Sequence, residues 1–321
     1  MFSSKENRLM IRYKLMDAHS PTTMRFKPCM AFRNISQLTR QNDQVDRSYR
    51  EVENGISTSM YYGYPEFFMQ FNKRVDFMYQ PYWNQGVEYI QDMQNGDTFK
   101  EDLYVPGYFE MPIAKGEEVI FSAGDILVNT SALTDEFNAE LKKRTPRSSF
   151  YNCLKNSAHQ FYYIPKTDEM YLLAGYPWFK VRARDQFVSL PGCTLSVGRP
   201  DDFTKIMDSA IPHIQDFLND KPRKNIIKQI DDPDVLLWVT WALQQYWKEN
   251  KPVFKEKYVD FLFSIINFIL SNKHPNLTVD PENGLVSTYG RDVAVSWMNA
   301  VQNGKPVTPR SGYLVEFNAL W

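Results

Sequence analysis

The first 130 residues alternate apolar and polar positions in the way that is typical of β-strands. The run RLMIRYKLM at residues 8–16 alternates apolar with basic side chains, which is the two-residue period of a half-buried strand. A second alternating run covers residues 24–32, and Pro28 within it indicates an edge strand or a bulge. These patterns predict an antiparallel β-sandwich over residues 1–130. Further strands are predicted at 58–64, 74–82 and 117–128, with turns at Asn95-Gly96 and Pro106-Gly107.

The period of the apolar positions changes after residue 130. In SALTDEFNAELKKR, Leu133, Phe137 and Leu141 recur at every fourth position, which predicts an amphipathic helix. A second helix is predicted over residues 149–158. Residues 131–165 are therefore expected to form a helical linker.

Residues 166–321 carry the signals of longer helices. Pro200 followed by two aspartates is typical of a helix start. The tripeptide DPD at 232–234 precedes VLLWVTWALQQYW, which is apolar on almost every face and is therefore expected to be buried. A third amphipathic helix is predicted at 253–270. Helices joined by loops predict an α-helical barrel or solenoid here, and an α+β protein for the whole chain.

Composition and charge exclude several classes of protein. The 37 Lys and Arg against 38 Asp and Glu give a net charge of -1, which argues against a general nucleic-acid binder. No apolar run is long enough to span a bilayer and no signal peptide is visible, so we expect a cytoplasmic protein with no membrane partner. The 3 cysteines and 4 histidines are scattered, which predicts neither disulfides nor a metal site. Because the P-loop and G-x-G-x-x-G motifs are absent, we expect no cofactor.

The stretch AGYPWFKVRARDQFVSLPG at 174–192 sets aromatic residues beside a charged pair. Trp178 offers a flat apolar face that suits a sugar ring, and Arg184 and Asp185 offer hydrogen bonds to sugar hydroxyls. The alternative is structural, with Asp185 as a helix cap and Arg184 as its solvated neighbour. On residue types alone, the structural alternative is favoured.

Two further carboxyl groups, those of Asp234 and Glu316, are candidates for chemistry. Asp234 opens the apolar helix, where an acidic residue is also typical of a plain helix cap. Glu316 lies among apolar residues, where an unpaired carboxylate is costly to bury, so Arg310 is its expected partner. Such a pair is also a common structural feature. Trp297 belongs to the same C-terminal group of residues.

Taken in order, these stretches resemble the glycogen debranching enzymes of the amylo-α-1,6-glucosidase type, in their bacterial and archaeal form. The family carries runs similar to AGYPWF and RDQFVSLPG, followed downstream by runs similar to SWMNA, NGKPVTPR and VEFNALW. In the first part of the chain, RYKLMDAHSPTTMRFKPCMAFRN and EDLYVPGYFEMPIAKGEEV resemble segments of the family's β-sandwich. The resemblance extends from about residue 8 to the last residue, and the motifs occur in the same order.

The resemblance implies a β-sandwich followed by an (α/α)6 barrel, each present in part. It implies an inverting glycoside hydrolase that releases glucose from α-1,6-linked branch points of glycogen or related α-glucans, with Asp234 of DVLLW as the general acid. The positions expected to bind substrate in the glucose pocket are Trp178, Arg184, Asp185, Trp297, Arg310 and Glu316.

Two departures from the family pattern affect the expected activity. Asn299 stands where the family has an aspartate, which removes one expected sugar contact. Family members extend beyond both ends of this sequence, so the chain looks truncated and the base carboxylate is expected beyond Trp321. The alternative function is that of a non-catalytic remnant that binds α-glucan without hydrolysing it. The oligomeric state and the natural glucan stay open.

Overall fold

The chain folds into two compact units in the computed structural model. The structure describes residues 1–3, 6–176, 178–222 and 226–321. The first unit is Met1–Arg144 and the second is Thr145–Trp321. The division falls within the stretch 131–165, so the two helices predicted there belong to different units.

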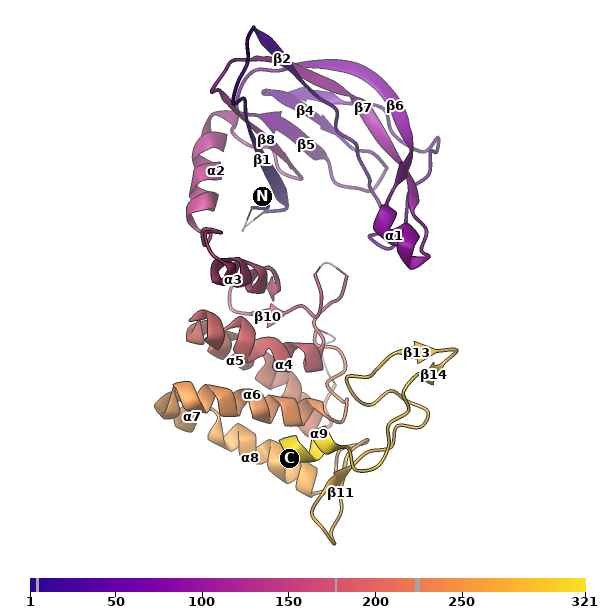
Figure 1. The fold of residues 1–321 in the computed structure, drawn as a ribbon, viewed down its shortest axis with the longest axis vertical. Coiled ribbons are helices and arrows are strands. Elements are labelled where there is room, and N and C mark those ends of the chain that lie inside the picture. The colour runs from indigo at the N-terminus through magenta and orange to yellow at the C-terminus, as the bar shows by residue number, and fades with distance from the viewer. Residues whose placement is uncertain (4–5, 177, 223–225) are drawn as a thin grey trace. The chain divides into compact units, whose positions relative to one another are not determined.

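The first unit consists mainly of two antiparallel sheets (Figure 1). The five-stranded sheet has the order β1-β8-β5-β4-β3, made of Arg8–Lys14, Glu118–Gly124, Phe67–Phe71, Gly55–Thr58 and Arg50–Val52. The three-stranded sheet has the order β2-β7-β6, made of Thr22–Phe26, Lys100–Ile113 and Asp76–Glu88. The helical elements of this unit are α1 (Ile90–Asn95), η1 (Thr130–Ala132) and α2 (Leu133–Lys142).

Both sheets contribute side chains to one hydrophobic core. Ile56 and Phe71 of the five-stranded sheet belong to the same buried cluster as Phe109 and Met111 of β7. Helix α2 forms a separate small cluster with Met10 of β1 and Ile120 of β8 through two of its own apolar side chains, Leu133 and Phe137. The antiparallel sheets and the first helix expected from the sequence are therefore present.

Several details of the first unit differ from the sequence predictions. The run at 58–64 is not a strand, because β4 ends at Thr58, and the run at 24–32 forms a strand only as far as Phe26, so Pro28 lies outside it. Asn95-Gly96 ends α1 within the segment that joins β6 to β7, so the turn there follows a short helix, and Leu141 is exposed on α2. Pro106-Gly107 lies inside β7 and does not form a turn.

Gly107 is required where β7 passes close to β6. It pairs with Tyr79 next to a shift in register, and its φ of 153° lies outside the range that side chains favour. A Cβ built there would lie 2.3 Å from the carbonyl oxygen of Met78.

We expect Gly107→Ala to destabilise the first unit by about 1–3 kcal/mol, measured by urea unfolding. Gly192→Ala is the control, because Gly192 lies in a helix with open space around its Cα, and there we expect a gain of about 0.5–1 kcal/mol. Equal responses of the two variants would contradict this account.

The second unit is built from helices with three short strand pairs (Figure 1). Its helices are α3 (Phe150–Gln160), α4 (Ala183–Cys193), η2 (Leu195–Val197), α5 (Pro200–Leu218), α6 (Val235–Glu249), α7 (Lys251–Lys257), α8 (Val259–Leu270) and α9 (Val315–Leu320). Its strand pairs are β9 with β10 (Tyr162–Tyr163, Tyr171–Leu172), β11 with β12 (Thr278–Val279, Val286–Ser287) and β13 with β14 (Val301–Gln302, Lys305–Pro306).

One large apolar core holds the helices of the second unit together. Phe187 of α4, Phe203 of α5 and Tyr246 of α6 are fully buried in it. The rings of Phe203 and Tyr246 are stacked with centroids 4.7 Å apart. Helix α4 packs against α6, and α5 against α8. The buried helix expected after DPD is therefore confirmed as α6.

Two expectations for this unit need correction. The helix predicted at 253–270 is interrupted at Tyr258, where α7 ends and α8 begins. The stretch 271–314, expected to be helical, contains short strand pairs and loops. The closed (α/α)6 barrel stays a prediction. Within the described ranges, no helix is both long and apolar enough to cross a membrane.

Candidate functional site

The most buried charged group in the second unit is an ion cluster between α4 and the start of α6. Arg184 lies in the first turn of α4, and its side chain is directed toward the residues that precede α6. Its Nε donates to Oδ2 of Asp234 over 2.7 Å, and its Nη2 donates to Oδ1 of the same carboxylate over 2.8 Å. Arg184 and Asp234 are 8% and 1% exposed. The geometry is that of a two-pronged arginine–carboxylate pair, which fixes both groups in direction as well as in distance.

Asp234 is held from a second side by its own helix. Trp238, one turn later in α6, donates from its indole Nε1 to Oδ2 of Asp234 over 3.1 Å. The backbone N–H of Trp238 also donates to the carbonyl oxygen of Asp234 over 3.0 Å. Both carboxylate oxygens of Asp234 therefore accept hydrogen bonds from protein groups.

Asp232 is the third member of this cluster. Arg184 Nη2 donates to Asp232 Oδ2 over 2.8 Å, so one nitrogen serves two carboxyl groups. The Asp232 side chain is 19% exposed, against 2% for that of Asp234. Burial, together with the charges of Asp234 and Asp231, outweighs the lowering by Arg184 and raises the pKa of Asp232 to about 6.

From the sequence, Asp232 was expected only to cap a helix. The signal that could have identified it is the spacing in DPD, which places two carboxyl groups on either side of a proline, so that both can reach one cation. In the structure Asp234 holds the N-cap position of α6, and the backbone carbonyl of Asp232 accepts from the N–H of Val235.

The side chains of the adjacent residues Arg184 and Asp185 lie in different surroundings. Arg184 is buried in the ion cluster, whereas Asp185 is exposed in the first turn of α4. The solvated role considered for Arg184 is therefore wrong, because its side chain is buried. Its hydrogen bonds to the two carboxylates come from Nε and Nη2, and sugar binding by Arg184 stays a prediction. Sugar binding by Asp185 stays a prediction.

The aromatic residues before α4 form an exposed loop. Trp178 is 64% exposed, and the loop is closed by hydrogen bonds from Phe179 N to Gly175 O and from Ala174 N to Lys180 O. Pro177 of the same motif lies outside the described residues. The exposed indole face is available to a ligand, as a sugar platform requires.

The C-terminal group forms a second ion pair. Arg310 donates from Nη1 to Oε1 of Glu316 and from Nη2 to Oε2 over 3.0 Å. Nη1 of Arg310 also donates to the hydroxyl of Ser296 over 3.3 Å. The hydrogen bonds from Arg310 lower the pKa of Glu316. The pairing expected from the sequence is confirmed, and Trp297 is exposed nearby in the chain.

The structure brings the predicted site residues together only in part. Arg184 and Asp234 meet, and Arg310 and Glu316 meet. Among the described residues, no hydrogen bond or ion pair joins these two groups to each other or to Trp178. Helices α6 and α9, at whose starts the two ion groups lie, are in contact.

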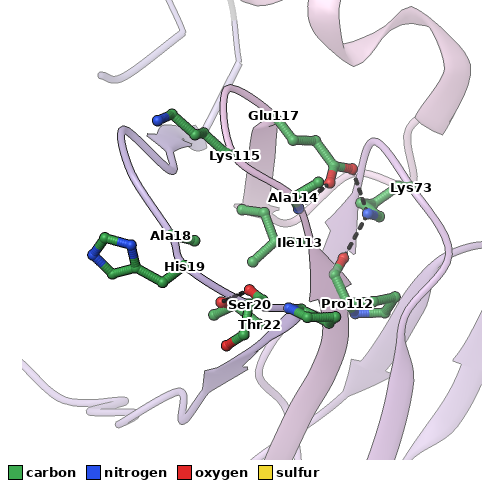
Figure 2. Close-up of a pocket in the computed structure, with 11 residues that line it drawn as sticks. Ala18, His19, Ser20, Thr22, Lys73, Pro112, Ile113, Ala114, Lys115 and Glu117 are labelled. Carbon is green, nitrogen blue, oxygen red and sulfur yellow. Dashed lines mark hydrogen bonds and ion pairs between the residues drawn. The ribbon is translucent and has the colours of Figure 1, made fainter.

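The main cavities lie elsewhere. One, of about 560 Å³ in the first unit, is lined by charged, small and aliphatic residues, and Figure 2 shows Lys73 there between Glu117 and the carbonyl of Pro112. Among the described residues, its lining includes the imidazole of His19 but no Phe, Tyr or Trp side chain. Another, of about 430 Å³ in the second unit, is lined by Thr240, Trp241, Gln244 and Trp247 of α6 and by apolar residues of α7, α8 and α9. In the part of the chain that the structure describes, no three His, Cys, Asp or Glu side chains are placed to hold a metal ion.

Two family models match the chain and together cover most of it. Residues 1–120 match the model described as glycogen debranching enzyme N terminal. Residues 149–321, more than half of the chain, match the model described as amylo-alpha-1,6-glucosidase. The comparisons with curated proteins and with solved structures find no match. The second match contains the whole of the ion cluster and the Arg310–Glu316 pair.

Proposed function

Because the chain belongs to the glycogen debranching enzyme family, we propose that it hydrolyses α-1,6-linked glucose at the branch points of glycogen or a related α-glucan. The observation that carries this proposal is the buried cluster of Arg184 with Asp232 and Asp234. It holds two carboxyl groups in fixed positions at the start of α6, inside the segment that matches the glucosidase model. Acid catalysis at a glycosidic bond requires such a carboxyl group.

The chemistry would follow the inverting course that the family resemblance implies. One carboxyl group protonates the glycosidic oxygen, and a carboxylate on the opposite side of the sugar activates water, at a separation of roughly 6.5–9.5 Å. The cluster at α6 supplies the acid, and the family motif points to Asp234 within it. The partner carboxylate is not assigned to a described residue.

Sugar recognition would come from the more exposed predicted residues. Trp178 and Trp297 would stack on the apolar faces of glucose rings, and Asp185 would accept hydrogen bonds from hydroxyls. The Arg310–Glu316 pair would add donors and acceptors held in fixed directions. Arg184 would hold the carboxyl groups of Asp232 and Asp234 in place.

The test combines a binding measurement with a release measurement. We expect isothermal titration of the full chain to show binding of maltooligosaccharides, and a coupled assay to show glucose release from a branched dextrin. Trp178→Ala should weaken binding about 3–10-fold, as expected for one lost stacking contact. Trp247→Ala is the matched control, because this exposed tryptophan of α6 has Lys251 over its ring and lies outside the predicted pocket.

A non-catalytic glucan-binding protein is the second candidate. It is favoured by the arrangement of Asp234, whose two oxygens are both engaged by Arg184 and Trp238. Binding of maltooligosaccharide without glucose release would support this alternative, and absence of both would contradict each proposal.

A further inference from the structure

Tyrosine side chains gather at one end of the five-stranded sheet of the first unit. Strands β3 and β4 form an antiparallel pair, with Tyr49 immediately before β3 and with Tyr61, Tyr62 and Tyr64 in the chain that follows β4. Tyr79 of β6 joins them, because its ring is stacked on that of Tyr49 with centroids 5.3 Å apart. We call these five residues the tyrosine surface. It lies outside the two cavities and the two ion groups described above.

Hydrogen bonds hold together the segments that carry these tyrosines. The backbone N–H of Asp46 donates to the carbonyl oxygen of Met60 over 2.9 Å. The hydroxyl of Tyr79 donates to the carbonyl oxygen of Arg47 over 3.2 Å. The segment before β3, the segment after β4 and strand β6 therefore meet, and the tyrosine surface is one region of the first unit.

The rings of the tyrosine surface are held in place and yet are open to solvent. Tyr79 is fixed by its hydrogen bond and by stacking, and it is 48% exposed. Tyr64 packs edge-to-face on Phe32 with centroids 5.7 Å apart and is 49% exposed, and Tyr62 is fully exposed. Exposed apolar groups gathered in one place are typical of interaction sites. Rings that are already fixed also lose little entropy when a ligand stacks on them.

The polar groups around the rings suit an uncharged ligand that is rich in hydroxyl groups. A tyrosine combines a flat apolar face with a hydroxyl that donates and accepts hydrogen bonds. Nδ2 of Asn42 donates to the hydroxyl of Tyr61 over 3.0 Å, which adds an amide to the same surface. The charged side chains of the segment before β3 include Asp43, Asp46 and Arg47, which give no excess of positive charge for a phosphate backbone. A glucan chain, with its apolar ring faces and its rims of hydroxyls, has the complementary chemistry.

We propose that the tyrosine surface is a second α-glucan site, which holds a linear stretch of the polymer while a branch point is bound elsewhere in the chain. Glucose rings stack on Tyr62, Tyr64 and Tyr79, and no bond forms or breaks there. The inference rests on the proposed function for the identity of the ligand, since the whole surface lies within residues 1–120, which match the N-terminal model of glycogen debranching enzymes. A glycogen particle presents many chain ends, so a second contact strengthens retention of the polymer without requiring a fixed distance between the two sites.

Native electrophoresis in gels that contain glycogen measures the affinity of the full chain for the polymer without turnover. We expect the double variant Tyr62→Ala with Tyr64→Ala to raise the dissociation constant by about 5–30-fold, as two lost stacking contacts imply. Tyr151→Ala is the matched control, because Tyr151 of α3 is 51% exposed but has Lys155 over its ring, and there we expect no change. An unchanged dissociation constant in the double variant would overturn the inference.

Hydroxyl-radical labelling read by mass spectrometry locates the contact on the unaltered chain, because exposed aromatic rings react readily. Maltoheptaose should lower the labelling of the peptide 59–66 and leave that of Tyr151 unchanged. Equal labelling of this peptide with and without the sugar would contradict the inference. So would labelling that falls with rising protein concentration alone, since a second copy of the chain would then cover the surface. Protection of the peptide in a chain that releases no glucose would support the inference and contradict only the proposed function.

Discussion

Replacing Arg184 with methionine is expected to destabilise the second unit by about 3–5 kcal/mol. The substitution keeps much of the side-chain volume but leaves Asp234 as a buried carboxylate with no cation, and removing one partner of a buried pair has this magnitude. Within the described part of the chain, the Asp232 carboxylate also loses its hydrogen-bond donor. Urea unfolding followed by tryptophan fluorescence measures the effect, because every tryptophan except Trp83 lies in this unit.

Two further variants separate the loss of the ion pair from a loss of packing. Arg182→Met makes the same chemical change two residues earlier, where the guanidinium lies over the ring of Phe179, and it should cost less than about 1 kcal/mol. The double variant Arg184→Met with Asp234→Asn removes both charges and keeps an oxygen for Trp238. It should recover at least about half of the loss, because uncharged replacements of buried pairs are often nearly neutral. A double variant as unstable as the single one would show that packing of the arginine side chain, and not its charge, stabilises this region.

Sequence patterns predicted the elements whose period is long and regular. Apolar spacing indicates which side chains of an element are buried. It therefore predicted β1 from its alternation, α2 from its apolar face, and α6 from its uniformly apolar sequence. The interruption at Tyr258 was not predictable in the same way, because the apolar spacing continues through it. The turn predicted at Pro106-Gly107 was wrong. Glycine occurs in turns and also where two strands approach closely, and Gly107 is of the second kind.

The residues of the candidate site were predicted from the sequence, but only one of its two ion pairs was. The Arg310–Glu316 pair followed from the cost of burying a carboxylate alone, and the partners are only six positions apart, so the prediction was local. The Arg184–Asp234 pair joins positions 50 residues apart, and only the packing of α4 on α6 brings them together. Asp232 was missed because a helix cap already accounted for its residue type, and the neighbour that gives it a different role is distant in the sequence.

Glu101→Gln is expected to destabilise the first unit by about 3 kcal/mol at pH 7, and the difference from the unaltered chain should disappear on acidification. Glu101 of β7 is fully buried and accepts hydrogen bonds from Arg33, from the hydroxyl of Tyr89 and from the backbone N–H of Thr39. Burial acts to raise its pKa, but these hydrogen bonds outweigh burial and lower the pKa from 4.5 to about 2. A shift of this size corresponds to roughly 3 kcal/mol of stability.

The sign of the pH dependence follows from the lowered pKa of Glu101. Its contribution is present in full above pH 4.5, where the carboxylate is charged in both the folded and the unfolded chain, and it is lost as the pH falls toward 2. Urea unfolding of the two proteins is followed by hydrogen exchange in peptides of β7 at several pH values from 7 to 2. The urea midpoints of the two proteins should therefore converge as the pH falls from 4.5 toward 2. Glu110→Gln on the same strand is the matched control, since Glu110 pairs with Arg25 at the surface and should contribute less than about 1 kcal/mol at any pH. A difference for Glu101→Gln that stays constant down to pH 2 would show that the loss comes from altered packing and not from the carboxylate charge.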